Sequence, residues 1–208
     1  MRTIRTRAAS ALLALILLLG LLPGTAWAAG PQEVSSAEEF AAMDASGNYI
    51  LTEDITISSP YGNPEKGPNY TQFTGSFDGN GHTITLDIDG TNYLGAFAYI
   101  ASSGEIENLV TDGVVTATSS TSYSGGIAGV CEGSITNCGN AATISGKKRL
   151  GGIAGHLGSS DNAGYITNCY NIGTISSSAS SACATGGIAG YVQNASSAVS
   201  NCCNSGTV

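Results

Sequence analysis

Apolar residues alternate with small or polar ones along most of the chain, which is the periodicity expected of β-strands. The alternation lies in short blocks that return at regular intervals. The block GGIAG occurs at 125–129, 151–155 and 186–190, after a degenerate copy, LGAFAYI, at 94–100. Each copy is followed by a second block, which reads IENLVTDGVVT from Ile106, ITNCGNAATIS from Ile135, ITNCYNIGTIS from Ile166 and VSNCCNSGTV from Val199. The chain therefore contains four repeats of about 30 residues.

These repeats predict a solenoid of parallel strands, because no helical pattern separates them and a fixed period lets them stack. We predict an all-β fold, a right-handed parallel β-helix with three short strands per coil. Stacking places equivalent residues in columns. One apolar column is predicted to face inward: Ile100, Cys131, Leu157 and Val192. A mixed column is predicted to face outward: Tyr99, Val130, His156 and Tyr191.

Two columns of the second block consist of residue types that are also common in active sites. One is Asn108, Asn137, Asn168 and Asn201, and the other is Leu109, Cys138, Cys169 and Cys202. Asparagine amides stacked about 4.8 Å apart can form a hydrogen-bonded ladder, and cysteine alternating with leucine behaves as a small buried hydrophobe. A catalytic cysteine has no reason to recur in every coil, so both columns are predicted to be structural. Left-handed backbone at the turn is predicted for Asn140, Asn171 and Asn204.

The first residues have the pattern of a secretory signal peptide. Three arginines precede an apolar run from Ala11 to Leu22, and Ala26-Trp27-Ala28 supplies a small-residue cleavage site. We predict a signal peptide over residues 1–28, with cleavage near Ala28. The mature chain is then secreted or exposed at the cell surface, and it contains no apolar run long enough for a transmembrane helix.

The mature chain divides into three predicted parts. Residues 29–45 are predicted to form a linker and a short helix that caps the N-terminal end of the solenoid, because Ser36 and Glu39 have the spacing of a capping box. Residues 46–93 are assigned to the opening coils and residues 94–208 to the four repeats. Val208 falls on the last strand position of the fourth repeat, so we expect the repeats to continue beyond it.

Charge and cysteine content narrow the possible partners. Without the three signal-peptide arginines, four basic residues remain against fifteen acidic ones, a net charge near −11. Such a surface repels nucleic acid and anionic lipid, so neither is predicted as a partner. Six cysteines in an exported chain suggest disulfides, but three of them recur in one column and cannot all pair within it. We predict mostly free thiols, with Cys203 and the loop residue Cys183 the more exposed.

Two carboxylate pairs are candidates for acid–base chemistry: Asp87 with Asp89, and Glu105 with Glu107. Members of each pair are two residues apart on a predicted strand, and so about 6.5–7 Å apart on one outer face. Solvated surface residues are the favoured interpretation. Lyase chemistry on an anionic sugar would also need a neighbouring basic group. The available basic residues are Lys66 and a predicted loop at 147–149, so no catalytic residue is assigned.

No metal site and no cofactor are predicted. The segment Asp78-Gly79-Asn80-Gly81-His82 is interpreted as a turn, because Asn-Gly and Asp-Gly form turns and strands flank the segment. His82 and His156 have no second His or Cys at ligand spacing. The D-x-D-G sequence from Asp87 lacks the distal Glu of a calcium loop.

The GGIAG blocks followed by ITNCYN-x-G-x-I resemble the GLUG-motif repeats of bacterial surface proteins. The segment FTGSFDGNGHTITLDI from Phe73 resembles the opening coils of the same right-handed β-helix proteins, which have the pectin-lyase-like architecture. The resemblance extends from about Glu33 to Val208. It implies an exported, often wall-attached, multidomain protein of Gram-positive type. In such proteins the β-helix is a stalk, an adhesin part or a region ahead of other modules, sometimes a peptidase. No catalytic residues belong to the motif.

The first functional hypothesis is a non-enzymatic cell-surface module that acts as a stalk or adhesin part and binds cell-surface or host glycans or proteins. The alternatives are a carbohydrate-active enzyme, either a polysaccharide lyase or a glycoside hydrolase, and the N-terminal region of a surface peptidase. The weak binding candidates are Tyr99, His156 and Tyr191, whose ring faces could stack on sugars or pack on a protein. Plain exposed strand residues are the favoured interpretation of this column.

Overall fold

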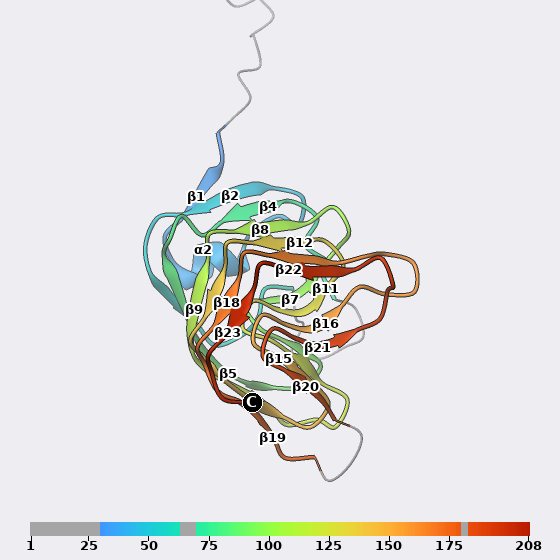
Figure 1. Cartoon of the computed structure of the whole chain (residues 1–208). Helices are drawn as coiled ribbons and strands as arrows, with labels where there is room; N and C mark the ends of the chain where they lie inside the picture. The colour runs from blue at the N-terminus through green and yellow to red at the C-terminus, as the bar shows by residue number, and fades with distance from the viewer. Residues whose placement is uncertain (1–29, 63–69, 180–182) are drawn as a thin grey trace, which may run out of the picture. The chain divides into compact units, whose positions relative to one another are not determined.

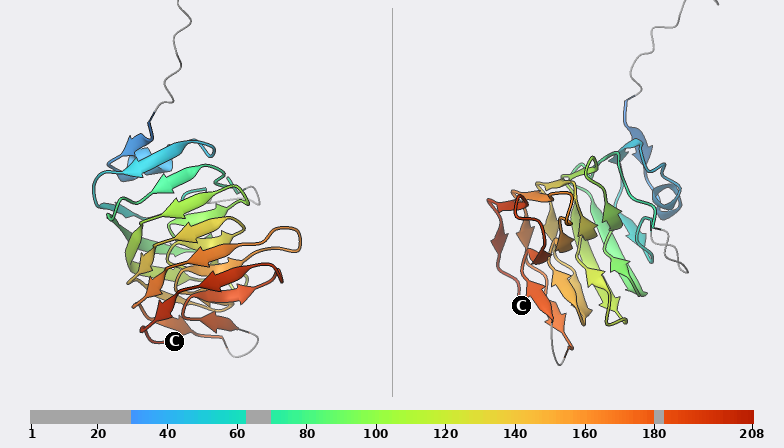
Figure 2. Two further views of the ribbon diagram at one scale, coloured as in Figure 1. Left: turned by 45° about the horizontal axis from the view of Figure 1, so that its top comes forward. Right: turned by 90° about the vertical axis from the view of Figure 1, so that its right-hand side faces the viewer.

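The computed structural model describes residues 30–62, 70–179 and 183–208 (Figure 1). The predicted signal peptide at 1–28 lies outside the described residues. Residues from Pro31 onward form one compact unit, a parallel β-helix whose coils stack from the blue to the red end in Figure 2. The predicted all-β parallel β-helix is therefore confirmed. Within the described part of the chain, no helix is long and apolar enough to cross a membrane.

Four parallel sheets run along the solenoid in the described residues. Sheet 1 contains β1 (Gln32–Val34), β2 (Asn48–Leu51), β4 (Ser76–Asp78), β8 (Glu105–Glu107), β12 (Ser134–Thr136), β17 (Tyr165–Thr167) and β22 (Ala198–Ser200). Sheet 2 contains β3 (Ile55–Ile57), β5 (Thr83–Gly90), β9 (Val110–Ala117), β13 (Gly139–Asn140), β14 (Thr143–Gly146), β18 (Tyr170–Asn171), β19 (Ile175–Ser177) and β23 (Cys203–Asn204).

The glycine-rich blocks form the other two sheets. Sheet 3 contains β6 (Tyr93–Leu94), β10 (Tyr123–Ser124), β15 (Arg149–Gly151) and β20 (Ala184–Gly186). Sheet 4 contains β7 (Phe97–Ile100), β11 (Ala128–Cys131), β16 (Ala154–Leu157) and β21 (Ala189–Val192). Each coil of the repeats therefore crosses four sheets, which differs from the three strands per coil that we predicted. The reason is that each glycine-rich block bends and supplies two strands.

The register of the sheets agrees with the columns derived from the repeats. In sheet 4, Cys131 pairs with Ile100 and with Leu157, and Leu157 pairs with Val192. The side chains of Ile100, Cys131 and Leu157 are fully buried, as predicted for an inward-facing column. Val192 belongs to the last described coil and is 47% exposed.

Left-handed backbone was wrongly predicted at Asn140, Asn171 and Asn204, which are strand residues. Asn140 and Asn171 are fully buried. The amide Nδ2 of Asn140 donates to Oδ1 of Asn171, and Nδ2 of Asn171 donates to Oδ1 of Asn204, both at 2.7 Å. Each amide also bonds the backbone two residues later, as Asn171 does with the N and O atoms of Gly173 at 3.2 Å. The Thr111 hydroxyl continues this ladder by donating to Asn140 at 3.0 Å. We call Thr111, Asn140, Asn171 and Asn204 the buried ladder; the first three are buried, and Asn204, in the last described coil, is exposed.

The second glycine of each GGIAG block leaves room for this buried ladder. A Cβ atom added at Gly126 would lie 2.2 Å from Oδ1 of Asn140. One added at Gly152 would lie 2.5 Å from Cγ of Asn171, and Gly187 has the same relation to Asn204 at 2.3 Å. The second glycine of GGIAG and the buried-ladder asparagine of the following block therefore pack against each other in each of these repeats.

The left-handed residues are instead the asparagines of the other column. Asn108, Asn137, Asn168 and Asn201 have φ values of 51°, 55°, 56° and 52°. They turn the chain from sheet 1 into sheet 2, a conformation that asparagine tolerates better than most residues. Asn137 donates to Asn108 at 3.4 Å and Asn168 donates to Asn137 at 3.2 Å. This column, which we call the corner ladder, lies largely at the surface.

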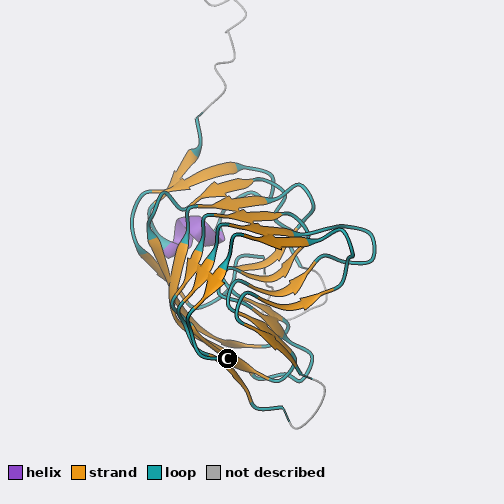
Figure 3. Cartoon of the chain, in the orientation of Figure 1, coloured by secondary structure: helices purple, strands orange, loops and turns teal. Residues whose placement is uncertain are grey.

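Helix α2 (Ala37–Ala41), purple in Figure 3, follows β1. Ser36 is its N-cap, and its Oγ accepts from the Glu39 N–H at 3.2 Å. The Glu39 carboxylate accepts from the N and Oγ atoms of Ser35 at 2.8 and 2.9 Å, so the reciprocal bond of the predicted capping box is displaced by one residue. These bonds lower the pKa of the Glu39 carboxyl. The predicted linker at 29–45 also contains a strand, β1, which pairs with β2.

Phe40 anchors α2 to the first coils. Its side chain is 1% exposed and meets three rings edge-on or nearly so, with centroid distances of 6.0 Å to Tyr61, 5.6 Å to Phe77 and 5.4 Å to Phe97. The helix therefore closes the N-terminal end of the apolar interior, which is the capping role that the sequence predicted.

The cysteine column lies inside the solenoid. Cys138 and Cys169 are buried and Cys202 is half-buried, and the backbone N–H groups of Cys138 and Cys169 donate to the sulfur of the next coil at 3.4 Å. Burial raises the pKa of the Cys138 thiol. Cys203 is exposed, but Cys183 is half-buried because its sulfur lies 3.0 Å from the Lys148 carbonyl oxygen. All six cysteines are free thiols in the structure.

We expect the native protein to react rapidly with Ellman's reagent at Cys203 and slowly at the interior column. Buried thiols react slowly because the thiolate is disfavoured in apolar surroundings. Unfolding without reductant should release all six thiols. The variant Cys203→Ser should remove the rapid phase and leave the slow ones. Recovery of no thiols from unreduced, unfolded protein would contradict this prediction.

Candidate functional site

Aromatic side chains gather on the outer side of the bend between sheets 3 and 4. The register of sheet 3 aligns Tyr93, Tyr123 and Arg149. The register of sheet 4 aligns Tyr99, Val130, His156 and Tyr191, as the repeats predicted. The short bends between the two sheets bring these columns together. We call the resulting cluster the aromatic corner, and its residues are Tyr70, Tyr93, Tyr99, Tyr123, Arg149, His156 and Tyr191.

A stack of planar groups runs across the coils at this corner. The rings of Tyr70 and Tyr93 are stacked with centroids 4.4 Å apart, and those of Tyr93 and Tyr123 with centroids 5.3 Å apart. The Arg149 guanidinium lies 4.4 Å from the Tyr123 ring centroid and 4.0 Å from that of Tyr191. Because Tyr123 belongs to the preceding coil and Tyr191 to the following one, two rings hold the guanidinium by cation–π contacts.

The imidazole of His156 also contacts the Arg149 guanidinium. Its Nδ1 lies 2.9 Å from Nη1 of Arg149. Arginine can only donate, so Nδ1 is the acceptor and the imidazole carries its proton on Nε2. Burial and then the positive charge of Arg149 lower the pKa of His156 to about 4. The imidazole is therefore neutral at physiological pH, and Arg149 retains the positive charge.

The column predicted to face outward is mostly covered. Val130 and His156 are only 3% and 7% exposed, whereas Tyr191 is 39% exposed. Tyr99 is half-buried, and its hydroxyl donates to Oε1 of Glu132. Burial and this hydrogen bond raise the pKa of Tyr99 well above its usual value. The covering groups come from sheet 3, as shown by the 5.2 Å centroid distance between Tyr123 and His156. Tyr191 is thus the surface member of the predicted column.

The stacking decides what the corner presents to a ligand. Neighbouring groups cover the faces of Tyr93 and Tyr123, so these rings present their edges rather than the faces expected to stack on sugars. Among the described residues, no hydrogen bond to the protein engages the phenol oxygens of Tyr93, Tyr123 or Tyr191, and none of these oxygens is buried. The corner therefore presents a row of hydroxyl groups beside a guanidinium edge.

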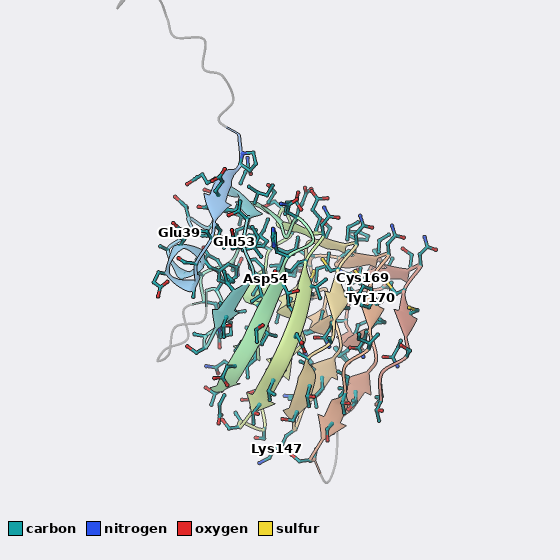
Figure 4. The ribbon with its side chains drawn as sticks, turned by 90° about the vertical axis from the view of Figure 1, so that its left-hand side faces the viewer. Glu39, Glu53, Asp54, Lys147, Cys169 and Tyr170 are labelled. Atoms are coloured by element: carbon teal, nitrogen blue, oxygen red, sulfur yellow. The ribbon has the colours of Figure 1, made fainter. Side chains whose placement is uncertain are left out.

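The predicted carboxylate pairs lie elsewhere. Asp87 and Asp89 are exposed on β5 in sheet 2, and Glu105 and Glu107 are exposed on β8 in sheet 1. Among the described residues, none of the four forms an ion pair with Lys or Arg. Figure 4 views the side of the solenoid that bears sheet 2, where Glu53 and Asp54 lie near the early coils and Lys147 lies toward the opposite end of the strands. The described residues thus show no basic group in contact with either carboxylate pair.

The segment Asp78 to His82 forms a turn between sheets 1 and 2, as predicted. Asn80 and Gly81 have φ values of 52° and 79°, and the His82 N–H donates to the Gly79 carbonyl at 2.8 Å. Nδ1 of His82 also lies 3.2 Å from Oδ1 of Asp54. Over the described ranges, no group of three His, Cys, Asp or Glu residues could hold a metal ion.

A cavity of about 420 Å³ lies beside α2. The described part of its lining includes Phe40, Met43, Ile57 and Tyr61, and no charged residue. None of its lining residues belongs to the aromatic corner. We interpret it as incomplete packing under the cap, and the corner remains the candidate site.

Arg149 is the residue of the candidate site that the sequence analysis did not identify. Residues 147–149 were predicted to lie in a loop, but Arg149 is the first residue of β15. A signal was present, because Tyr93, Tyr123 and Arg149 all stand two residues before the first glycine of their blocks. Aligning that position across the repeats would have placed the arginine in the tyrosine column.

The chain is thus a parallel β-helix repeat module, and the aromatic corner, with its phenol hydroxyls and guanidinium, is its candidate surface site. No protein-family model matches the chain, so its resemblance to GLUG-motif proteins stays a prediction. Halomucin from Haloquadratum walsbyi is 31% identical to it over 152 residues. That match covers 64% of this chain but only 2% of halomucin.

A solved structure shares the fold. The crystal structure of a putative immunoglobulin A1 protease from Bacteroides ovatus superposes with a TM-score of 0.56 at 18% sequence identity. The match covers 84% of this chain and 67% of the Bacteroides protein. At this identity the likeness shows the β-helix fold alone.

Proposed function

We propose that this chain is a non-catalytic β-helix module of an exported surface protein and that it binds glycans through the aromatic corner. The observation that supports the proposal most directly is the row of phenol hydroxyls beside Arg149, which have no hydrogen-bond partner among the described residues. Sugars are recognised by such hydroxyl and charged groups held in fixed positions. The similarity to halomucin and the fold shared with the Bacteroides ovatus protein are consistent with a module of a surface protein.

A solenoid suits this role because its ligand groups repeat with the coils. Adjacent coils present equivalent positions about 4.8 Å apart, close to the 5.3 Å between the rings of Tyr93 and Tyr123. An extended oligosaccharide lying along the axis can therefore meet one protein group per coil. The strands beneath hold these groups in place, so little ordering entropy is lost on binding.

An enzymatic role is the second candidate, and Asp87 and Asp89 are the residues that would favour it. They lie on one exposed strand face at the spacing of an acid–base pair. Among the described residues neither carboxylate forms an ion pair with Lys or Arg, which argues for the binding role, because anionic-sugar cleavage needs a cation beside the carboxylates.

A glycan array probed with the purified protein tests the binding role. Tyr123→Ala should weaken binding to the array ligand at least about tenfold, equivalent to about 1.4 kcal/mol. Tyr165→Ala is the matched control, because Tyr165 is 47% exposed on sheet 1 and lies outside the corner. Equal losses in both variants would refute the proposed site. Sugar release that Asp87→Asn abolishes would instead establish the enzymatic role.

A further inference from the structure

Among the described residues, Arg149 is a cation without a carboxylate partner. Fifteen acidic residues outnumber the four basic ones that follow the signal peptide, yet no carboxylate among the described residues lies within ion-pair distance of this guanidinium. The nearby Glu132 carboxylate is already engaged by Tyr99 and by Asn162, whose Nδ2 donates to it at 2.8 Å. An arginine that forms no ion pair with the described part of a strongly acidic protein is available to an anion from outside.

The guanidinium is also held in a fixed orientation. Tyr123 and Tyr191 lie against it, and Nη1 donates to the neutral imidazole of His156. Its remaining N–H donors have no protein acceptor among the described residues. A planar fork of this kind binds a carboxylate through two parallel hydrogen bonds. Lys148 adds positive charge, since its ammonium nitrogen lies 5.6 Å from the Tyr123 ring centroid.

The net charge of the chain limits which anions can bind. The formal net charge is −8 for the full sequence and near −11 without the predicted signal peptide, and it repels a polyanion along its entire length. A single carboxylate in contact with Arg149 gains the short-range interaction, while the distant carboxylates are screened over about 10 Å at 0.1 M salt. One negative charge on an otherwise neutral ligand therefore fits this surface better than a chain of acidic sugars.

We propose that the aromatic corner binds a neutral oligosaccharide that bears a single carboxylated sugar, with the carboxylate on Arg149 and the sugar hydroxyls on Tyr93, Tyr123 and Tyr191. This proposal rests on the glycan-binding function proposed above and specifies its ligand class. The carboxylated sugar can be a nonulosonic acid or a uronic acid, which share the carboxylate that Arg149 recognises.

Calorimetric titration with matched sugars tests the proposal. The acidic ligands are sialyllactose and cellobiouronic acid, and their neutral counterparts are lactose and cellobiose. We expect at least one acidic ligand to bind about tenfold or more tightly than its neutral counterpart, and the tighter of the two identifies the source of the carboxylate. Trigalacturonate should bind more weakly than that ligand.

Three variants distinguish bidentate binding by the Arg149 guanidinium from a general effect of positive charge. Arg149→Gln should abolish the preference for the acidic sugar, and Arg149→Lys should retain only part of it, because lysine keeps the charge but not the bidentate geometry. Lys147→Gln removes the same charge from an exposed neighbour and should change affinity less than about twofold. Thermal unfolding of each variant verifies that the fold is intact.

The outcomes separate the two proposals. Equal binding of acidic and neutral sugars, or equal effects of Arg149→Gln and Lys147→Gln, would refute the carboxylate inference and leave glycan binding standing if Tyr123→Ala still reduces affinity. Binding to none of the sugars, here or on the array, would overturn both.

Discussion

Replacement of Asn171 by alanine is expected to lower the free energy of unfolding by about 3–5 kcal/mol. The substitution removes the hydrogen bond that the Asn171 side chain accepts from Asn140 and the one that it donates to Asn204. It also removes the two bonds between this side chain and the backbone of Gly173. It leaves Nδ2 of the buried Asn140 without one of its acceptors and the carbonyl of the buried Gly173 without this donor, at about 1–3 kcal/mol for each buried polar group. It also opens a space against Gly152, whose Cα faces the amide. Urea denaturation followed by circular dichroism measures the change.

The corner ladder provides the matched control. Asn168→Gly removes an exposed amide of the same residue type while keeping a residue that tolerates the left-handed φ of 56°. Because water replaces the lost bonds, we expect a change of less than about 1 kcal/mol. Similar losses in Asn168→Gly and Asn171→Ala would contradict the assignment of the main structural role to the buried ladder.

The two asparagine columns show how far the sequence alone can lead. Strand periodicity and a repeat of about 30 residues determine the stacking, so both columns and the cysteine column could be predicted in register. The sequence could not show which of the two asparagine columns faces the interior, because both columns come from the same block, with their residues three positions apart, as in Asn168 and Asn171. The deciding fact is the space left by the second glycine of GGIAG, which lies in another part of the coil.

The site was harder to predict for a related reason. The periodicity gives columns within each sheet but not the bend angle between sheets 3 and 4. That angle brings Arg149 onto His156 and covers a column that was predicted to face solvent. A Lys-Lys-Arg run has the local composition of a solvated loop, and only its register with Tyr93 and Tyr123 identifies the arginine as part of the corner.

Phe40→Ala is the second substitution with a large expected effect, about 3–5 kcal/mol of unfolding free energy. This is the usual cost of removing a buried aromatic side chain, and Phe40 is 1% exposed among Tyr61, Phe77 and Phe97. The adjoining cavity of about 420 Å³ should make the loss larger, because its lining includes Phe40 and the void left by the ring would join it. Urea denaturation measures the total loss of unfolding free energy.

The coils that lose stability in Phe40→Ala show whether Phe40 closes the N-terminal end of the interior or stabilises the whole solenoid. A solenoid is stabilised largely by contacts between neighbouring coils, so hydrogen exchange should accelerate first in β2 and β4 and only later in β17. Ser36→Ala weakens the helix itself through its N-cap and should cost only about 1 kcal/mol. If Phe40→Ala costs no more than Ser36→Ala, or if exchange accelerates equally in all coils, α2 does not seal the interior. A loss confined at first to the early coils would establish that the ring of Phe40 keeps water out of the open end.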